Sequence, residues 1–112
     1  MTMVHANELK AKCQADYQVL LKNISQYYPD VFCACYKQKI IESYSMIDVP
    51  VSTRDIIDTV RDYIDIPQNI LHRVSPDVID GFIDFLKEFG YEVSDYTERG
   101  TRYIGVLVYE PS

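Results

Sequence analysis

Two segments in the second half of the chain repeat one pattern of apolar and acidic residues, and this pattern most restricts the fold. Residues 53–65 and 76–89 each carry acids every three or four positions, with apolar residues between them. At about 100° per residue on a helical projection, the acids fall on one face and the apolar residues on the other. The sequence therefore predicts two amphipathic helices that bury their apolar faces in one core.

Capping residues and a proline set the expected starts of these helices. Ser52 or Thr53 can cap the first helix. Ser75 is the expected N-cap of the second, and Pro76 suits its first helical position, where the missing N–H costs nothing. Residues 67–74 are then a connector with at most one helical turn.

The end of the chain predicts a β-hairpin. Gly90 follows the second helix as its C′ glycine. Residues 91–96 and 103–109 are rich in β-forming residues and flank the turn "TERGT", which contains Gly100. The last strand has two apolar faces. One must meet the helices, and the other is either covered by residues 30–47 or exposed as a contact surface.

The first half of the chain predicts further helices. Residues 6–27 have the periodicity of an amphipathic helix, which Asn7 can cap and Pro29 ends. Residues 30–47 fit a helix, because apolar residues recur every four positions, but also fit a hairpin around a "KQK" turn. We favour the helix. Residues 48–51, "DVPV", are expected to be extended.

The whole chain, 1–112, is expected to form a single small α+β domain, with three to four helices plus a C-terminal antiparallel β-hairpin. No apolar run is long enough to span a membrane, and the N-terminus shows no secretion signal. The three cysteines are an odd number and do not indicate a disulfide framework. We therefore expect a cytoplasmic protein.

Charge is distributed unevenly along the chain. The net charge is −6. Residues 1–50 carry five acids and five bases, whereas residues 51–112 carry twelve acids and six bases, so the second half holds the whole excess. Such a field favours a partner protein with a basic surface, and disfavours direct contact with nucleic acid or with a membrane.

The acids on the two predicted helices are the candidate partner-binding residues. They are Asp55, Asp58, Asp62, Asp65, Asp77, Asp80, Asp84 and Glu88. Neighbouring acids of a row step about 4.5–6 Å along the helix axis, comparable with phosphate spacing along a nucleic-acid strand. Two interpretations stay open. The rows are ordinary hydrated faces, or they form a double acidic row that mimics nucleic acid and occupies a basic groove.

No pattern in the chain indicates an enzyme, a cofactor site or a metal site. The acids lie opposite the apolar faces, so they do not converge as a buried catalytic pair. Cys33 and Cys35 form one pair without the second pair that structural zinc needs, and His72 stands alone. Phosphate-binding glycine loops are absent from the sequence. We therefore expect a non-catalytic protein without cofactor or metal.

Part of the chain resembles a group of viral proteins. The segments "SPDVIDGFIDFLKEFGYEVSDY" and "RYIGVLVYE" are similar to the C-terminal half of many small, uncharacterised phage-encoded accessory proteins, and "ANELKAK" is similar to their opening helix. The resemblance implies a small acidic protein that acts by binding in the host cytoplasm. Inhibition of a DNA-handling defence protein of the host is one such activity.

Two other functions stay open. A virion or assembly component would use the apolar face of the last strand, formed by Tyr103, Leu107 and Tyr109, which could also form a homodimer. A winged-helix regulator would have three helices followed by a hairpin, with Arg99 and Arg102 at the wing. The acidic helix before the hairpin disfavours direct DNA binding in that case.

Overall fold

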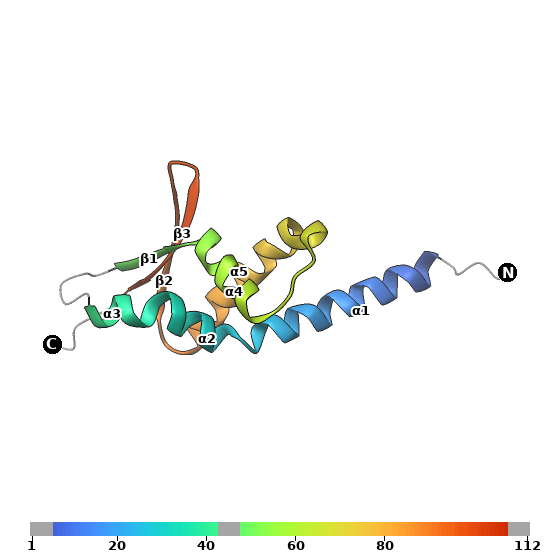
Figure 1. Cartoon of the computed structure of the whole chain (residues 1–112), viewed down its shortest axis with the longest axis horizontal. Helices are drawn as coiled ribbons and strands as arrows, with labels where there is room; N and C mark the ends of the chain where they lie inside the picture. The colour runs from blue at the N-terminus through green and yellow to red at the C-terminus, as the bar shows by residue number, and fades with distance from the viewer. Residues whose placement is uncertain (1–5, 43–47, 108–112) are drawn as a thin grey trace.

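The structure, a computed structural model, describes residues 6–42 and 48–107. It confirms the predicted α+β class, with helices packed on a three-stranded antiparallel sheet (Figure 1). The helices are α1 (Ala6–Ser25), α2 (Tyr28–Phe32), α3 (Gln38–Glu42), α4 (Thr53–Tyr63) and α5 (Leu71–Glu88), with a π-helical segment η1 (Cys33–Lys37) and a 3₁₀ turn η2 (Gln68–Ile70). The strands are β1 (Asp48–Ser52), β2 (Glu92–Glu98) and β3 (Thr101–Leu107).

The sheet has the order β1-β3-β2, so the last strand is central. The predicted hairpin is present, but its turn is shorter than "TERGT". Glu98 pairs with Thr101, and only Arg99 and Gly100 lie between the strands, both with positive φ, 52° and 80°. Two residues with positive φ are typical of a type I′ turn, whose twist matches that of the strands. Both strands therefore extend closer to the tip than predicted.

One face of the sheet is buried. Val49 pairs with Val106 and Val51 with Ile104, and all four side chains lie in the core. Tyr36 closes this face from the helical side, because its hydroxyl donates to the Ile104 carbonyl at 2.7 Å. The extended conformation predicted for residues 48–51 is confirmed. Their pairing with β3 was not predicted, because register depends on a partner far away in the sequence.

The opposite face of the sheet points away from the described helices. Tyr96 and Tyr103 stack there, with ring centroids 5.6 Å apart. The hydroxyl of Ser94 donates to the Asp48 carboxylate at 3.4 Å, across Gly105, where a Cβ would overlap both groups. The predicted apolar face of the last strand is thus only half-buried at Tyr103 and Leu107. Tyr109 lies outside the described residues.

The helix α4 ends earlier than predicted. Residues 53–65 were expected to be helical, but α4 ends at Tyr63, and Ile64 is extended. The chain leaves the helix early because Ile66 is buried and stands before a proline, which disfavours helical backbone. Ser52 caps α4 as predicted, since its hydroxyl accepts the Asp55 N–H.

The predicted start of α5 at residue 76 was wrong. The helix begins at Leu71, so residues 71–74 are not part of a connector and Pro76 lies inside the helix. Ser75 does not cap it, because its hydroxyl donates to the Leu71 carbonyl at 2.6 Å. A proline inside a helix removes one hydrogen bond and costs about 3 kcal/mol. Burial of Val74 and partial burial of Leu71 offset that cost.

The C′ glycine of α5 was predicted correctly, although the helix ends at Glu88, one residue before the predicted end. Gly90 has φ 88° and its N–H donates to the Lys87 carbonyl, while the Tyr91 N–H donates to the Leu86 carbonyl. These two hydrogen bonds are those of a Schellman motif. The motif turns the chain directly into β2 and so positions the hairpin against α5.

The first half of the chain is helical as favoured from sequence. Residues 28–42 form a continuous helical run, α2–η1–α3, and residues 43–47 lie outside the described part. The opening helix ends at Ser25, two residues earlier than expected, and Asn7 lies inside it. Residues 6–16 are all exposed, and Figure 1 shows this end of α1 leading away from the body. Within the described ranges, every helix is too short or too polar to cross a membrane.

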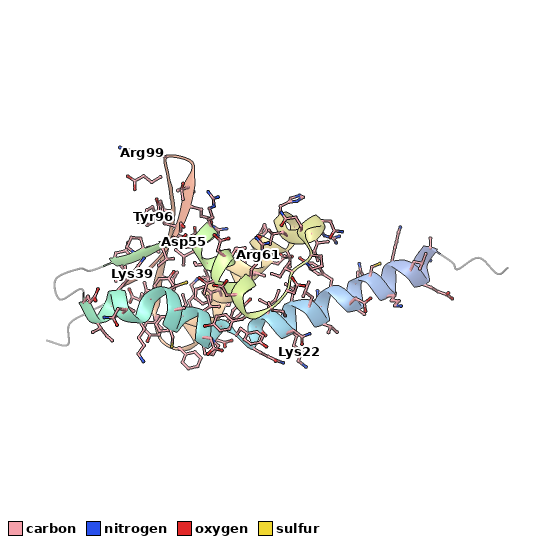
Figure 2. The ribbon with its side chains drawn as sticks, viewed as in Figure 1. Lys22, Lys39, Asp55, Arg61, Tyr96 and Arg99 are labelled. Atoms are coloured by element: carbon pink, nitrogen blue, oxygen red, sulfur yellow. The ribbon has the colours of Figure 1, made fainter. Side chains whose placement is uncertain are left out.

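The element order from α2 to β3 is helix, strand, helix, helix, strand, strand, with the first strand at the sheet edge. The winged-helix alternative predicted three helices followed by a hairpin, whereas the strand β1 here lies between α3 and α4. Figure 2 shows Arg99 at the tip of the β2–β3 hairpin.

Candidate functional site

All eight acids selected from the sequence are exposed. Seven of them have no lysine, arginine or histidine nitrogen within 4.0 Å among the residues that the structure describes. The exception is Asp80, whose carboxylate lies 3.8 Å from the Arg102 guanidinium. Asp65 lies beyond the end of α4, so it no longer continues the helical row.

Some members of the two acidic rows border cavities, and these cavities are different. On α5, Asp77, Asp84 and Glu88 line a groove of about 520 Å³ between α5 and α1. On α4, Asp58 lines a separate cavity between α4 and α5. The prediction placed both rows on solvent-facing sides, but sequence spacing could not show that α5 separates them.

The acidic groove is shaped by small residues and by α1. Gly81 lies on the floor of the groove, and a Cβ there would overlap the Tyr28 hydroxyl, which donates to the Val78 carbonyl at 3.2 Å. Burial raises the pKa of Tyr28 to about 12, with Asp84 nearby as the second cause. Tyr28 therefore stays a neutral donor. Lys22 is the one basic residue among the residues that line this groove.

A contact between α1 and α5 lies next to the groove, at its lining residue Asp77. The Tyr17 hydroxyl donates a hydrogen bond to the Asp77 carboxylate, and the Arg73 guanidinium lies 5.2 Å from the centre of the Tyr17 ring. Partial burial, followed by the hydrogen bond from Tyr17 to Asp77, raises the pKa of Tyr17. These contacts hold the second half of α1 on α5.

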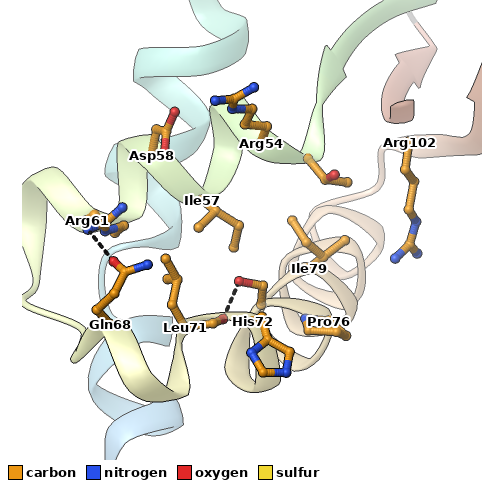
Figure 3. Close-up of a pocket in the computed structure, with 12 residues that line it drawn as sticks. Arg54, Ile57, Asp58, Arg61, Gln68, Leu71, His72, Pro76, Ile79 and Arg102 are labelled. Atoms are coloured by element: carbon orange, nitrogen blue, oxygen red, sulfur yellow. Dashed lines mark hydrogen bonds between the residues drawn. The ribbon is translucent and has the colours of Figure 1, made fainter. Parts of the chain in front are cut away.

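The cavity on the other side of α5 is lined by basic residues, which the sequence did not predict. It measures about 570 Å³ and lies between α4, the start of α5 and β3 (Figure 3). Arg54, Arg61 and Arg102 line it, together with His72. Arg54 and Arg61 are seven residues apart, so they lie on one face of α4, and that spacing was the available signal. Arg102 comes from a distant strand and could not be assigned to the site from sequence.

Arg102 is held in place by carboxylates. Its guanidinium donates to both Asp95 carboxylate oxygens, at 2.9 and 2.7 Å. This bidentate pair lowers the pKa of Asp95, with the hydrogen bond as the largest cause. Asp80 adds a third oxygen at 3.8 Å. Strand β3 is thereby tied to α5 on the side of the basic cavity.

The remaining candidates from the sequence show no reactive arrangement. Cys13 and Cys33 are exposed, whereas Cys35 is buried and its thiol lies 3.4 Å from the Thr59 hydroxyl. Burial raises the pKa of the Cys35 thiol, which disfavours the thiolate. Within residues 6–42 and 48–107, no three histidine, cysteine, aspartate or glutamate side chains gather as metal ligands would.

Comparison of the chain with protein-family models, with curated proteins and with solved structures finds no significant match.

Proposed function

We propose that the protein is a non-catalytic interaction module that binds a basic surface of a partner protein through the acidic groove between α1 and α5. One observation carries the proposal. Asp77, Asp84 and Glu88 line a single groove in which Lys22 is the only basic lining residue within the described part of the chain. Carboxylates with few local cations favour a basic partner and accelerate its encounter by electrostatic steering.

The shape of the groove indicates how such a partner would bind. A double-row mimic of nucleic acid needs both acidic rows on one surface, whereas here the row on α5 and Asp58 on α4 border different cavities. A concave site of about 520 Å³ suits lysine or arginine side chains of a protruding segment. We therefore favour a partner that inserts basic side chains into the groove. The double-row mimic of nucleic acid is the alternative.

The sequence resemblance to phage accessory proteins suggests the biological role of such an interaction. An acidic module of a phage would act in the host cytoplasm, where it would inhibit a host defence protein by occupying a basic, nucleic-acid-binding surface. Contact between partner and groove would weaken steeply with salt, because the attraction between charged surfaces is screened.

The test compares two double variants with equal charge changes. Asp84→Asn/Glu88→Gln neutralises the groove, and Asp55→Asn/Asp62→Asn neutralises the same number of charges on α4. Tagged wild type and both variants are used to capture proteins from a bacterial lysate, and each captured protein is measured by mass spectrometry. We expect a basic, salt-sensitive partner that the groove variant loses and the α4 variant keeps.

Three outcomes separate the proposals. Equal loss in both variants would support the double-row mimic instead of the groove. Equal retention in both would exclude the acids as the binding site. If the wild type captures no basic, salt-sensitive protein at all, the interaction function itself is contradicted.

A second candidate is a winged-helix regulator, favoured by the hairpin that follows the helices and by the arginine at its tip. The acids on α5 oppose it, because the helix before a wing normally enters the DNA groove. A gel shift with duplex DNA at low salt tests this candidate, and the absence of a shifted band counts against it.

A further inference from the structure

The basic cavity on the α4 side of α5 is unexpected in a chain of net charge −6. All five arginines of the protein lie in its second half, at 54, 61, 73, 99 and 102. Three of them line the cavity, where Asp58 is the only acid among the described lining residues. Most of the arginines of this acidic protein therefore surround one cavity.

The two arginines of α4 form no ion pair within the described part of the chain. Arg61 contacts the Gln68 amide oxygen at 3.4 Å, and neither Arg54 nor Arg61 has a carboxylate within 4.0 Å in the described part of the chain. Arg102 differs, because Asp95 and Asp80 partly neutralise it and fix its position. A ligand would therefore find two unpaired guanidinium groups on one wall and one positioned guanidinium on the other.

The base of the cavity is apolar. Ile57 and Ile79 are buried at its centre, and Leu71 is half-buried beside them. Figure 3 shows these three side chains in the middle, with Arg61 and Arg102 on opposite sides. Thr53 and Arg54 in the first turn of α4 also line the cavity, so the positive end of that helix dipole adds to the field.

Size and surroundings indicate the class of ligand. A volume of about 570 Å³ lies within the usual range of small-molecule sites. The apolar base offers contact to an organic body, which phosphates of a nucleic-acid backbone would not use. Asp58 lines the cavity and lies between Arg54 and Arg61 in the sequence, and Asp80 and Asp95 flank Arg102. A long polyanion would therefore meet three carboxylates that repel it.

We propose that this cavity binds a small organic phosphate, with the phosphate held by Arg54 and Arg61 and an apolar or aromatic body resting on Ile57, Leu71 and Ile79. Guanidinium groups bind phosphate through paired, charge-assisted hydrogen bonds. The site lies on the opposite side of α5 from the acidic groove, so it is independent of the proposed partner site.

Phenyl phosphate is the probe, because it joins one phosphate to one aromatic ring. It is titrated into the isotope-labelled full-length chain, and amide chemical shifts are followed by NMR, with inorganic phosphate and phenol in parallel. We expect saturable shifts at Ile57, Arg61, Leu71 and Ile79. Phenyl phosphate should bind more tightly than inorganic phosphate or phenol, because only it uses both the arginines and the apolar base.

Exposed arginines can be changed without disturbing the core. Arg54→Gln/Arg61→Gln should weaken phenyl phosphate binding by about tenfold or more, from loss of charge-assisted hydrogen bonds. Lys87→Gln removes an exposed base elsewhere on α5 and should leave binding unchanged. Neither variant touches Asp84 or Glu88, so failure here is distinguishable from failure of the acidic groove.

Several results would overturn the site. These are unsaturable shifts, equal affinity in the arginine variant and the wild type, or equal affinity for phenol and phenyl phosphate. A fourth is displacement of phenyl phosphate by a short DNA duplex that binds more tightly and with strong salt dependence. That result would assign the arginines to nucleic acid and favour the winged-helix regulator.

Discussion

The two flanks of α5 carry opposite charge, although a single helix separates them. Toward α1, three carboxylates line a groove with one lysine, and toward α4 three arginines line a cavity with one aspartate. The acids come from α5 itself, whereas the arginines come from α4 and β3. The comparison teaches that the net charge of −6 describes neither surface. Each surface depends on which elements meet there.

Removing a buried ring of α5, the helix that both flanks share, should reduce the stability of the fold more than any other change proposed for the two flanks. Phe82 is fully buried, and its ring lies 5.6 Å from that of Tyr28 and 6.1 Å from that of Tyr36. Phe82→Ala should lower the free energy of unfolding by about 3–5 kcal/mol, because it leaves a cavity in the core. Urea unfolding measures the change. Phe89→Ala, at a ring that is 69% exposed, is the control and should cost less than about 1 kcal/mol. Equal costs would show that α5 is not packed as described.

The acidic flank depends on the contact between Tyr17 and Asp77. Tyr17→Phe removes a hydrogen bond to a carboxylate and should destabilise the α1–α5 contact by about 1 kcal/mol or somewhat more. Hydrogen exchange should accelerate in α1 while α4 stays protected. Tyr27→Phe is a matched control, since the Tyr27 ring stacks on Tyr63 at 5.7 Å and should be unaffected by losing its hydroxyl. Unchanged exchange in α1 after Tyr17→Phe would contradict the contact.

The basic flank should respond to acid through Asp95, with the smallest effect. Arg102 lowers the pKa of Asp95 from its ordinary value of 3.8, so the pair stabilises the folded state fully above that value. The contribution is lost as pH falls through the lower pKa of the folded state. Because Asp95 is partly exposed, we expect a difference below about 1 kcal/mol between wild type and Asp95→Asn at neutral pH.

That difference should shrink toward zero as the pH falls below 3.8, measured by urea unfolding across a pH series. Asp62→Asn, at an exposed acid without a cation within 4.0 Å in the described chain, should show no such convergence. A wild-type advantage over Asp95→Asn that persists unchanged into acid would contradict the role of the Asp95–Arg102 pair.

Local features of the fold could be predicted because their causes are local. The apolar and acidic faces of α4 and α5 follow from residue spacing, the cap by Ser52 from its hydroxyl, and the end of α5 from Gly90. The hairpin followed from β-forming residues around Gly100. The exposure of the seven acids on α4 and α5 also followed, since it depends on the face of the helix that each acid occupies, whereas Asp65 is exposed beyond the end of α4.

Features that depend on distant residues were missed. Pro76 normally indicates a helix start, but burial of Val74 outweighs that local preference and extends α5 to Leu71. The pairing of β1 with β3 was missed for a similar reason, because "DVPV" shows extended backbone without naming its partner.

The sequence by itself determined the amphipathic helices, the hairpin and the acid-rich second half, because helical period, capping and turn chemistry act over a few residues. Only the tertiary structure decided that α5 divides the charges, with carboxylates toward α1 and arginines toward α4. The physical reason is that a cavity is lined by whichever side chains the packing of several elements brings together. Arg61 and Arg102, forty-one positions apart, share one cavity only because α4 and β3 bury their apolar residues in the same core.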